Sequence, residues 1–363
     1  MKKKRILICV NHEIVIYNFR KELVYALLEK DHDVYISSPE GPKTNILKEH
    51  GAHIIPLTIE RHSKNPIKDI KLYFEYRRII MNVKPNIILT YTIKPNIYAG
   101  FASRMLNVPY IVTITGLGSA LNKGIKSFIP HFLYQFSLKK AHHIFFQNQE
   151  NYQYMIKHRL FKGSSSIVRG SGVNLNEFKL EPFPKNNHSS FMFVGRIMKA
   201  KGINNYLRLA KTIKQDFPET EFHLVGSMEE DYQSSIEDLN KNGTIIYHGS
   251  MQDVRPIYQK VQAIILPSYH EGLSNVLLEA ASTGRVIIAS DISGCKETFV
   301  EGESGLSFNP YDFNDMMNKV KKFMRLPLEI KEHMGLKGRA YVEKHFDRRE
   351  VVQKHIETIE EVL

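Results

Sequence analysis

Leu266-Pro-Ser-Tyr-His-Glu-Gly-Leu-Ser-Asn-Val-Leu-Leu-Glu-Ala280 joins the end of an apolar run, residues 263–266, to a helix-like segment that starts near Ser274. The apolar run has the length and the β-branched content of a buried strand. A strand that is followed by a short loop and a helix is the building unit of a parallel sheet covered by helices. This stretch therefore predicts an α/β fold.

The same alternation of short apolar runs and longer helical segments continues on both sides of this stretch. It stops at residues 180–190, which are rich in Pro, Asn and Ser and predict a linker, and then starts again. The pattern predicts two Rossmann-like domains with doubly wound parallel sheets, over residues 1–180 and 190–345. A last helix, over residues 346–363, is expected to pack back on the first domain.

Ligands bind at the carboxyl ends of the strands in such sheets, so we expect the two domains to face each other across a cleft. The predicted strands cover residues 5–10, 33–37, 53–57, 86–89, 110–113, 143–146, 191–194, 221–225, 244–247, 263–266 and 286–289. The main helices predicted in the first half cover residues 18–30, 67–82 and 96–106.

Length and composition exclude several classes of protein. The 363 residues are enough for two domains, and no run approaches the roughly 20 apolar residues of a membrane-spanning helix. The basic start, Met1-Lys-Lys-Lys-Arg5, is followed by too short an apolar run for a signal peptide, so we expect a cytoplasmic protein. Cys9 and Cys295 are too few for a disulfide framework or a zinc site.

The net charge of +12 is concentrated in the first half of the chain. Residues 1–180 carry 27 Lys and Arg against 12 Asp and Glu, or +15, which leaves 23 against 26, or −3, for residues 181–363. Between Glu75 and Glu150 there is no acidic residue. Such a basic half indicates an anionic partner, which can be nucleic acid, a membrane leaflet or a phosphorylated substrate, unless it is only a solvated surface.

A second strand end carries two cations and two glycines. Phe193-Val-Gly-Arg-Ile-Met-Lys-Ala-Lys-Gly202 runs from a strand into a loop that contains Arg196 and Lys201. An Arg side chain can hold two phosphate oxygens at once and Lys adds a point charge, while glycine lets the backbone approach a ligand closely. The pattern favours phosphate binding, with a plain solvated strand end as the alternative.

The quoted stretch offers a complementary set of groups. The amides near Gly272, Leu273 and Ser274 lie at a helix start, where unpaired N–H groups can hold a diphosphate. Glu271 precedes the helix and Glu279 follows eight residues later, about 12 Å away if all eight are helical. This exceeds the spacing of paired glycosidase carboxylates and suits two acids at opposite ends of one extended ligand. The alternative is an ordinary helix with an acidic cap.

Together, Gly195-Arg196 with Lys201-Gly202 and Glu271-x7-Glu279 resemble the donor-site signature of the retaining glycosyltransferases of family four, which have the B-type fold of two Rossmann-like domains. The resemblance covers nearly the whole chain, and it is closest to bacterial enzymes that extend a sugar on undecaprenyl diphosphate. Its further parts are residues 172–178 with Asn174 in place of a usual Asp, Pro267-Ser268, Gly284, Gly294 to Gly305 with Glu297, Tyr17 to Arg20, Lys94 to Asn96 and Gly116 to Ser119.

The resemblance implies roles for individual residues. Arg196 and Lys201 would bind the donor diphosphate, Glu279 would hold the ribose hydroxyls and Glu271 would contact the transferred sugar, in a front-face mechanism without a protein nucleophile. The implied donor-binding residues are Gly195, Arg196, Lys201, Glu271, Gly272, Leu273, Ser274 and Glu279, of which Arg196, Lys201 and Glu271 are catalytic. The implied acceptor-binding residues are Asn18, Arg20, Lys94, Gly116 and Gly118.

Two parts of the chain depart from that family. Residues 11–17 replace a common glycine-rich turn, and Thr115-Gly116 stand where many relatives have a His, so the role of that His is not transferred. Asp31-His-Asp33 fits the metal-binding pattern of the other large glycosyltransferase fold, but here it lies between a helix end and a strand. We expect a connecting turn there, activity without a metal and no cofactor.

Residues 123–140 place Phe128, Phe132 and Phe136 on one helical stripe with Lys at both ends. This pattern is typical of a helix that lies in a membrane interface, and equally of a core helix with a buried aromatic face. The sequence leaves both interpretations open.

The leading hypothesis is a hexosyltransferase that moves an N-acetylhexosamine or deoxy-hexosamine from a UDP-sugar to a polyprenyl-diphosphate-linked saccharide. Capsule, O-antigen or protein-glycan assembly would use it, peripherally on the inner face of the cell membrane, where the basic half meets anionic lipid. One alternative is a non-hydrolysing UDP-sugar 2-epimerase, which lacks the Glu-x7-Glu arrangement. Another is a basic nucleic-acid-binding protein, but the chain has no recognition motif for nucleic acid, so we expect no such partner.

Overall fold

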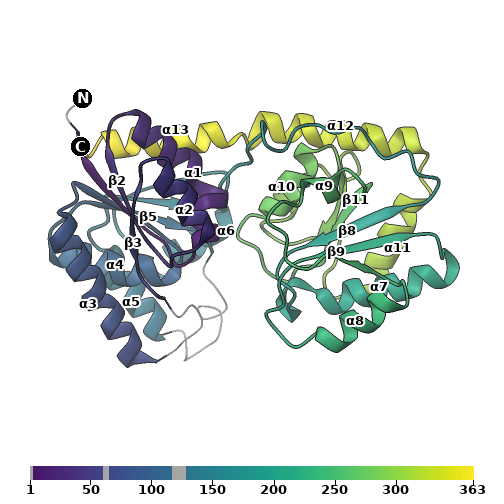
Figure 1. Ribbon diagram of the computed structural model, residues 1–363, viewed down its shortest axis with the longest axis horizontal. Coiled ribbons are helices and arrows are strands. Elements are labelled where there is room, and N and C mark those ends of the chain that lie inside the picture. The colour runs from purple at the N-terminus through teal and green to yellow at the C-terminus, as the bar shows by residue number, and fades with distance from the viewer. Residues whose placement is uncertain (1–2, 60–64, 117–127) are drawn as a thin grey trace. The chain divides into compact units, whose positions relative to one another are not determined.

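The computed structural model describes residues 3–59, 65–116 and 128–363 (Figure 1). The chain forms two compact units. The N-terminal unit comprises Met1–Ser171 and Arg349–Leu363, and the C-terminal unit comprises Gly172–Arg348. Each unit is a parallel α/β sheet, which confirms the fold class predicted from the sequence. Among the described residues, no helix combines the length and the apolar character that crossing a bilayer requires.

The division between the units comes before the Pro-rich stretch at residues 180–190. This stretch is fastened to the C-terminal unit by Arg285, a fully buried side chain on the loop before β12. Its Nη2 donates to the carbonyl oxygens of Glu181 and Pro182, at 2.6 and 2.8 Å. Burial lowers the pKa of Arg285 to about 10, and the carbonyls supply the partners that a buried cation requires.

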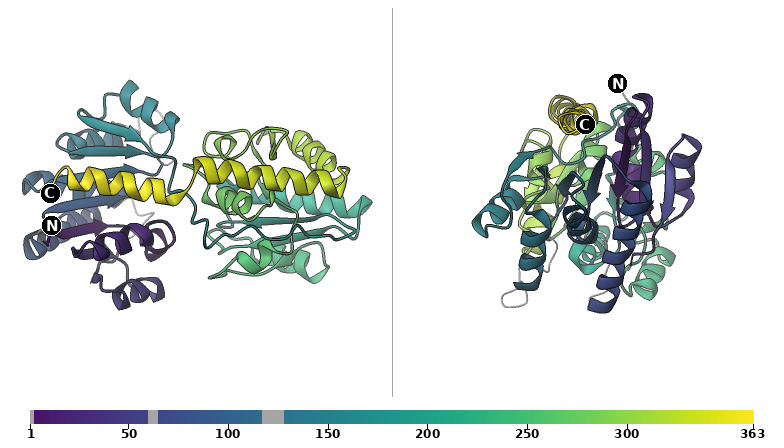
Figure 2. Two further views of the ribbon diagram at one scale, coloured as in Figure 1. Left: turned by 90° about the horizontal axis from the view of Figure 1, so that it is seen from above. Right: turned by 90° about the vertical axis from the view of Figure 1, so that its left-hand side faces the viewer.

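The N-terminal unit has a seven-stranded sheet in the order β3-β2-β1-β4-β5-β6-β7, with all pairs parallel. Helices α3, α4 and α5 cover one face, and α1, α2 and α13 cover the other (Figures 1 and 2). The strands are β1 Arg5–Cys9, β2 Asp33–Ser38, β3 His53–Pro56, β4 Ile87–Tyr91, β5 Tyr110–Ile114, β6 His143–Phe146 and β7 Ser164–Ile167. The helices are α1 Glu13–Glu29, α2 Pro42–Glu49, α3 Pro66–Val83, α4 Ile93–Met105, α5 Phe128–Leu138, α6 Gln149–Lys157 and α13 Arg348–Glu360.

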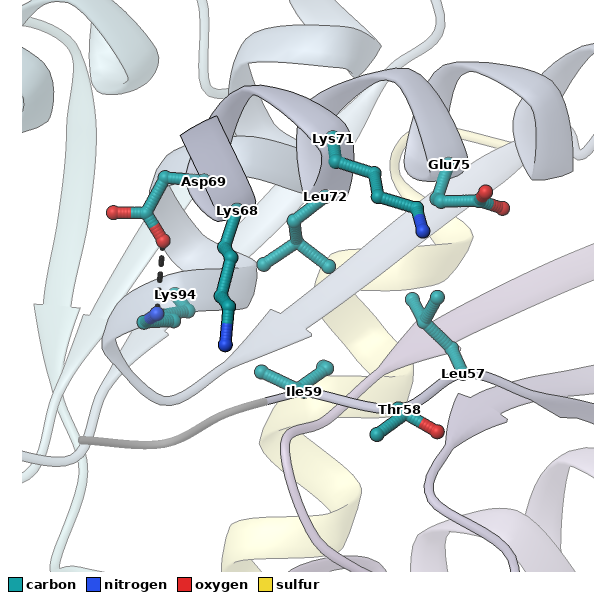
Figure 3. A pocket seen from close by; sticks show the side chains of 9 residues that line it. All are labelled: Leu57, Thr58, Ile59, Lys68, Asp69, Lys71, Leu72, Glu75 and Lys94. Atoms are coloured by element: carbon teal, nitrogen blue, oxygen red, sulfur yellow. Dashed lines mark hydrogen bonds and ion pairs between the residues drawn. The ribbon is translucent and has the colours of Figure 1, made fainter. Parts of the chain in front are cut away.

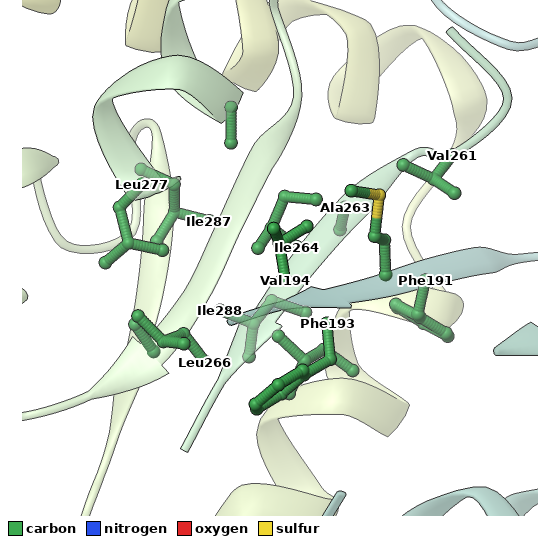
Figure 4. Packing of buried hydrophobic residues seen from close by; sticks show 14 of the residues in the cluster. Phe191, Phe193, Val194, Val261, Ala263, Ile264, Leu266, Leu277, Ile287 and Ile288 are labelled. Atoms are coloured by element: carbon green, nitrogen blue, oxygen red, sulfur yellow. The ribbon is translucent and has the colours of Figure 1, made fainter. Parts of the chain in front are cut away.

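The C-terminal unit has a six-stranded parallel sheet in the order β10-β9-β8-β11-β12-β13. Its core consists of aliphatic and aromatic side chains from β8, β11 and β12 and the helices around them (Figure 4). The strands are β8 Ser190–Val194, β9 Glu221–Val225, β10 Ile246–Tyr247, β11 Ala263–Leu266, β12 Val286–Ser290 and β13 Gly305–Phe308. The helices are α7 Ile203–Asp216, α8 Gln233–Lys241, α9 Arg255–Tyr258, α10 Asn275–Ser282, α11 Phe313–Met324 and α12 Leu328–His345, with 3-10 turns η2 Lys199–Lys201 and η3 Lys296–Thr298.

Two interpretations left from the sequence can now be compared with the structure. Asp31 has a φ of +60° and joins α1 to β2, which confirms the connecting turn. On α5, Phe132 and Phe136 are 56% and 38% exposed, so the interpretation as a helix with a wholly buried aromatic face is wrong for these two residues. The side chain of Phe128, together with Lys123 and Lys126, lies outside the described part of the chain.

Candidate active site

The loops after β8 and β11 meet in the C-terminal unit. Gly202 ends the η2 turn with a φ of +72°, and a Cβ placed on it would lie 1.9 Å from the carbonyl oxygen of Pro267. Next to this contact, the amide of Tyr269 donates to the carbonyl oxygen of Ala200 at 3.1 Å. Only glycine allows the two backbones to approach this closely. The two motifs that the sequence analysis singled out therefore form one site.

An ion pair joins the two loops. Lys201 Nζ lies 2.6 Å from Glu271 Oε1, and the two side chains are only 19% and 11% exposed. Arg196 is more open: its side chain is 40% exposed, and its Nη1 lies 3.9 Å from Glu229 Oε2. Before it, Gly195 has a φ of +155°. The site thus offers one cation held by a carboxylate and a second that can reorient towards an anion.

The start of α10 differs in one detail from the expected diphosphate cradle. The amide of Ser274 donates to the carbonyl oxygen of Gly294 at 2.8 Å, which corrects the expectation that this amide is open to a ligand. Leu278 makes the first intrahelical bond, to Ser274. The amides of residues 275–277 therefore have no partner inside the helix, and they are the donors that a helix start presents to an anion.

The loop after β12 packs against Glu271 and Gly272. Gly294 has a φ of +87°, and a Cβ there would lie 2.7 Å from Gly272 O and 2.9 Å from Glu271 Cβ. Glu297 holds this loop: its Oε2 accepts from the amide of Gly294 at 2.6 Å, and its Oε1 accepts from the Ser293 hydroxyl at 3.0 Å. The sequence showed Gly294 and Glu297 only as parts of a family resemblance, and this supporting role is new.

Glu279 is a half-buried carboxylate inside α10, whereas Glu271 lies in the loop, so the two are not separated by eight helical residues. Burial raises the pKa of Glu279 to about 7, and the positive charge of Arg348 opposes this rise. The phenol oxygen of Tyr258, a fully buried side chain on α9, lies 3.4 Å from Glu279 Oε2 and 3.2 Å from Val276 O, the two acceptors for its one proton. No local pattern in the sequence points to Tyr258 or Arg348, because both affect Glu279 from distant elements.

The expected acceptor residues that the structure describes lie in the N-terminal unit, on α1, at the start of α4 and after β5. Arg20 is 4% exposed, and its guanidinium lies 4.8 Å from the centre of the Tyr91 ring on β4. Asn18 is exposed on the same helix, α1. Gly116 has a φ of +159°, and a Cβ there would meet no atom within 4 Å. Gly118 lies outside the described residues.

Lys94 lies at the start of α4, across the sheet from α1, and lines a cavity of about 350 Å³ (Figure 3). Its Nζ is 2.8 Å from Asp69 Oδ1 on α3, and both side chains are mostly buried. Thr92, just before the helix, has φ +70° and ψ 162°, a conformation that costs a β-branched residue about 1–3 kcal/mol and is typical of functional sites. The cavity is lined by Leu57, Thr58, Ile59, Lys68, Asp69, Lys71, Leu72, Glu75 and Lys94.

Within the described ranges, no group of three or more His, Cys, Asp or Glu side chains is arranged to hold a metal ion. Activity without a metal stays a prediction. The chemistry that the C-terminal site can perform is binding of an anionic ligand: two cations and a helix start for phosphate oxygens, and the carboxylates of Glu271 and Glu279 for hydroxyl groups.

Comparison with known proteins gives the two halves of the chain separate matches. Residues 176–341 match the family described as Glycosyl transferases group 1. Residues 5–148 match the family described as Glycosyl transferase 4-like. The first match contains every residue of the candidate site in the C-terminal unit from Gly195 to Glu297, and the second contains Lys94 and the cavity beside it.

Individual proteins are similar along most of the chain. The N,N'-diacetylbacillosaminyl-diphospho-undecaprenol alpha-1,3-N-acetylgalactosaminyltransferase of Campylobacter jejuni is 27% identical, over 96% of each chain. The UDP-Gal:alpha-D-GlcNAc-diphosphoundecaprenol alpha-1,3-galactosyltransferase of Escherichia coli is 27% identical, over 71% of each chain. Among solved structures, Anabaena HepE in complex with UDP and glucose has a TM-score of 0.80 at 15% identity and covers 99% of this chain and 100% of its own. That likeness shows the fold alone.

Proposed function

Because the chain belongs to the glycosyltransferases that combine a glycosyl transferase 4-like part with a glycosyl transferases group 1 part, we propose that it transfers a sugar from a UDP-sugar to a polyprenyl-diphosphate-linked saccharide. The transferred sugar is an N-acetylhexosamine or a deoxy-hexosamine, and the product enters capsule, O-antigen or protein-glycan synthesis. The observation that carries the proposal is the joining of two separate motifs at the Lys201–Glu271 pair, beside the start of α10.

The donor site in this proposal uses the charges already described. Arg196, Lys201 and the first amides of α10 bind the diphosphate and stabilise the charge that develops on it as the sugar leaves. When the diphosphate engages Lys201, Glu271 gains freedom to accept hydroxyl bonds from the sugar. Glu279 accepts bonds from the ribose hydroxyls, and the UDP-Gal donor in the name of the Escherichia relative supports a nucleotide of this kind.

The reaction retains the anomeric configuration. Both relatives named above form alpha linkages according to their names, and a UDP-sugar that is itself alpha-linked gives an alpha product only with retention. An oxygen of the leaving diphosphate takes the proton of the acceptor hydroxyl on the same face of the sugar, so no protein nucleophile is needed. The reaction needs no metal because Arg196, Lys201 and the helix start supply the positive charge.

The acceptor binds to the N-terminal unit at the cavity beside Lys94. The cavity combines ammonium and carboxylate groups with an apolar wall, which suits a charged saccharide carrier. The names of the Campylobacter and Escherichia relatives support a carrier of the diphospho-undecaprenol kind. Such a carrier lies in a membrane, so the chain works peripherally at the inner face of the cell membrane. Neither the epimerase nor the nucleic-acid-binding alternative has support from these relatives.

The proposal is tested by incubating the purified chain with a panel of UDP-sugars and a short-chain polyprenyl-diphosphate saccharide. We expect UDP release with one or two donors, only when the acceptor is present, together with an acceptor whose mass has grown by one sugar. Release of UDP without an acceptor, or conversion of the donor to its 2-epimer, would contradict the proposal.

A further inference from the structure

Three neighbouring helices of the N-terminal unit expose apolar side chains on the face away from the sheet. On α3 these side chains follow helical spacing, which places them along one stripe. Two more come from α5 and one from the end of α4. With their exposed fractions they are Ile67 75%, Ile70 58%, Phe74 57%, Met81 43%, Met105 53%, Phe132 56% and Phe136 38%.

Aromatic contacts join these helices into one surface. The ring of Phe74 lies 5.2 Å from that of Tyr73 on α3, and Tyr73 stacks at 4.8 Å on Phe101 of α4. Phe101 meets Phe136 of α5 edge-on at 4.9 Å, and Phe136 lies 6.1 Å from Phe132. These five residues form what we call the aromatic band, which crosses α3, α4 and α5. Phe74, Phe132 and Phe136 are exposed, and the partly buried rings of Tyr73 and Phe101 link them. An apolar surface that is joined in this way marks a binding face rather than scattered exposure.

The border of the aromatic band on α5 is cationic. The guanidinium of Arg104 lies 4.0 Å from the centre of the Phe136 ring. Beside Phe132 and Phe136 is a cavity of about 300 Å³, and none of the described residues that line it is acidic. The other lining residues are Gln135, Lys139, Arg159, Phe161 and Lys162. Aromatic rings next to cations, without carboxylates, are the composition that an anionic lipid interface attracts.

We propose that the aromatic band is the surface by which the N-terminal unit enters the interface of an anionic membrane, and that the cationic cavity at its edge takes the phosphate of a lipid headgroup. The apolar rings insert among the acyl chains while the cations stay at the level of the phosphates. A protein partner would be expected to supply carboxylates against Lys139, Arg159 and Lys162, whereas the phosphates of a bilayer supply that charge everywhere. The proposal rests on the proposed function, since a lipid-linked acceptor brings the enzyme to a bilayer.

The apolar part is tested by co-sedimentation of the full chain with vesicles of phosphatidylcholine and phosphatidylglycerol. The double variant Phe74→Gln, Phe132→Gln should bind about tenfold or more weakly, because it removes insertion on two of the three helices. The matched control is Ile330→Gln, Leu336→Gln on α12, whose side chains are 47% and 46% exposed in the other unit. Equal weakening by both pairs, or none by the first, would overturn the proposal.

The cationic cavity is tested with Arg159→Gln, Lys162→Gln. This pair should lose about tenfold or more in binding to the mixed vesicles and little in binding to pure phosphatidylcholine. The control, Lys241→Gln, Lys344→Gln, removes the same charge from exposed positions of the C-terminal unit and should bind as the wild type does. If the two pairs behaved alike, net charge rather than the cavity would decide binding and the cavity assignment would be wrong.

Two further measurements keep the outcomes separate. Light scattering of the wild type and the Phe74→Gln, Phe132→Gln variant tests the other occupant, a second copy of the chain: a dimer lost in the variant without any vesicle binding would overturn the membrane proposal. Calorimetric UDP titration of each variant should match the wild type, which shows that the fold and the C-terminal site are intact. Failure of the wild type to bind UDP would instead count against the proposed function.

Discussion

The two units share one plan, a parallel sheet between helices, but they present different kinds of surface. In the C-terminal unit, the loops that hold Lys201 and Glu271 pack so closely that Gly202 and Gly294 lie where backbones meet. In the N-terminal unit, the aromatic band leaves large apolar side chains in solvent, and residues 1–180 carry +15 against −3 in the remainder. We infer from this difference that a small soluble ligand requires fixed polar groups, whereas a membrane requires apolar area and positive charge.

The largest effect is expected from the contact that fixes the C-terminal loops. Gly202→Ala places a Cβ 1.9 Å from Pro267 O and forces the loops apart, so the free energy of unfolding should fall by about 3 kcal/mol or more. Gly243→Ala is the matched control, since Gly243 has a φ of +73° but nothing within 4 Å of its Cβ position, and only backbone strain of about 1 kcal/mol is expected. Urea unfolding of both variants measures the difference; equal losses would mean that the close approach does not matter.

Arg196→Ala tests the claim that the fixed polar groups act on the transition state. Because we propose that Arg196 meets the leaving diphosphate as its charge develops, kcat should fall roughly 100-fold or more. Arg208→Ala, on α7 with its guanidinium over the Phe313 ring at 3.9 Å, is the control for loss of a cation in the same unit. A near-normal kcat in Arg196→Ala would remove this residue from the mechanism.

Glu279→Gln tests whether the Glu279 carboxylate binds the ribose hydroxyls. The change removes a charge and one acceptor oxygen from a half-buried position, so UDP affinity should drop by about 1.5–3 kcal/mol. Calorimetric titration of UDP gives the value. A variant that binds UDP as tightly as the wild type would show that Glu279 does not contact the nucleotide.

A smaller effect is expected from Tyr258, through the pKa of Glu279. Because burial raises that pKa to about 7, the contribution of Glu279 to stability is present below its ordinary pKa and lost as the pH rises through about 7. In the proposed site, ribose hydroxyls donate to the ionised form of Glu279. The affinity for uridine, which has no phosphates that titrate, should therefore rise with pH through about 7. Tyr258→Phe removes a donor to the carboxylate and should move this midpoint upwards.

The control for Tyr258→Phe is Tyr206→Phe, which removes another fully buried phenol, one that donates to the carbonyl oxygen of His223 at 2.6 Å away from Glu279. NMR titration with uridine at several pH values follows the midpoint. A midpoint that moves equally in both variants would point to general loosening of the unit instead of a bond to Glu279.

Most of the fold could be predicted because the strands are short apolar runs with clear ends, and β6 and β11 have the predicted bounds. Two edge strands were missed. β7 reads Ser-Ser-Ser-Ile and is partly exposed, so it has neither the apolar content nor the alternation that identifies a strand. β13 begins at Gly305 and is only four residues long. Both segments are strands because they pair with a neighbouring strand, β7 with β6 and β13 with β12, and the local sequence does not show such pairing.

The candidate site could be predicted where chemistry and sequence spacing coincide, as for Lys201 and Glu271. It could not be predicted where a group in the site bonds to a segment that is distant in the sequence. The carbonyl oxygen of Gly294 accepts a hydrogen bond from the amide of Ser274, and the phenol of Tyr258 lies within hydrogen-bond distance of the Glu279 carboxylate. No pattern in the neighbouring sequence predicts either contact. The aromatic band has the same origin: each helix alone looks amphipathic, and only the packing of the helices against one another shows that Tyr73 and Phe101 link the exposed rings.

The most direct test of the central claim, that the loops joined at Lys201 and Glu271 form the nucleotide site, is calorimetric titration of UDP into the full chain and two variants. The wild type should bind one UDP per chain, and Lys201→Met should weaken binding tenfold or more, because a charge-assisted bond to phosphate is worth about 1.5–3 kcal/mol. Lys199→Met, on the same η2 turn but exposed, should leave the affinity unchanged. No UDP binding by the folded wild type, or equal losses in both variants, would contradict the account.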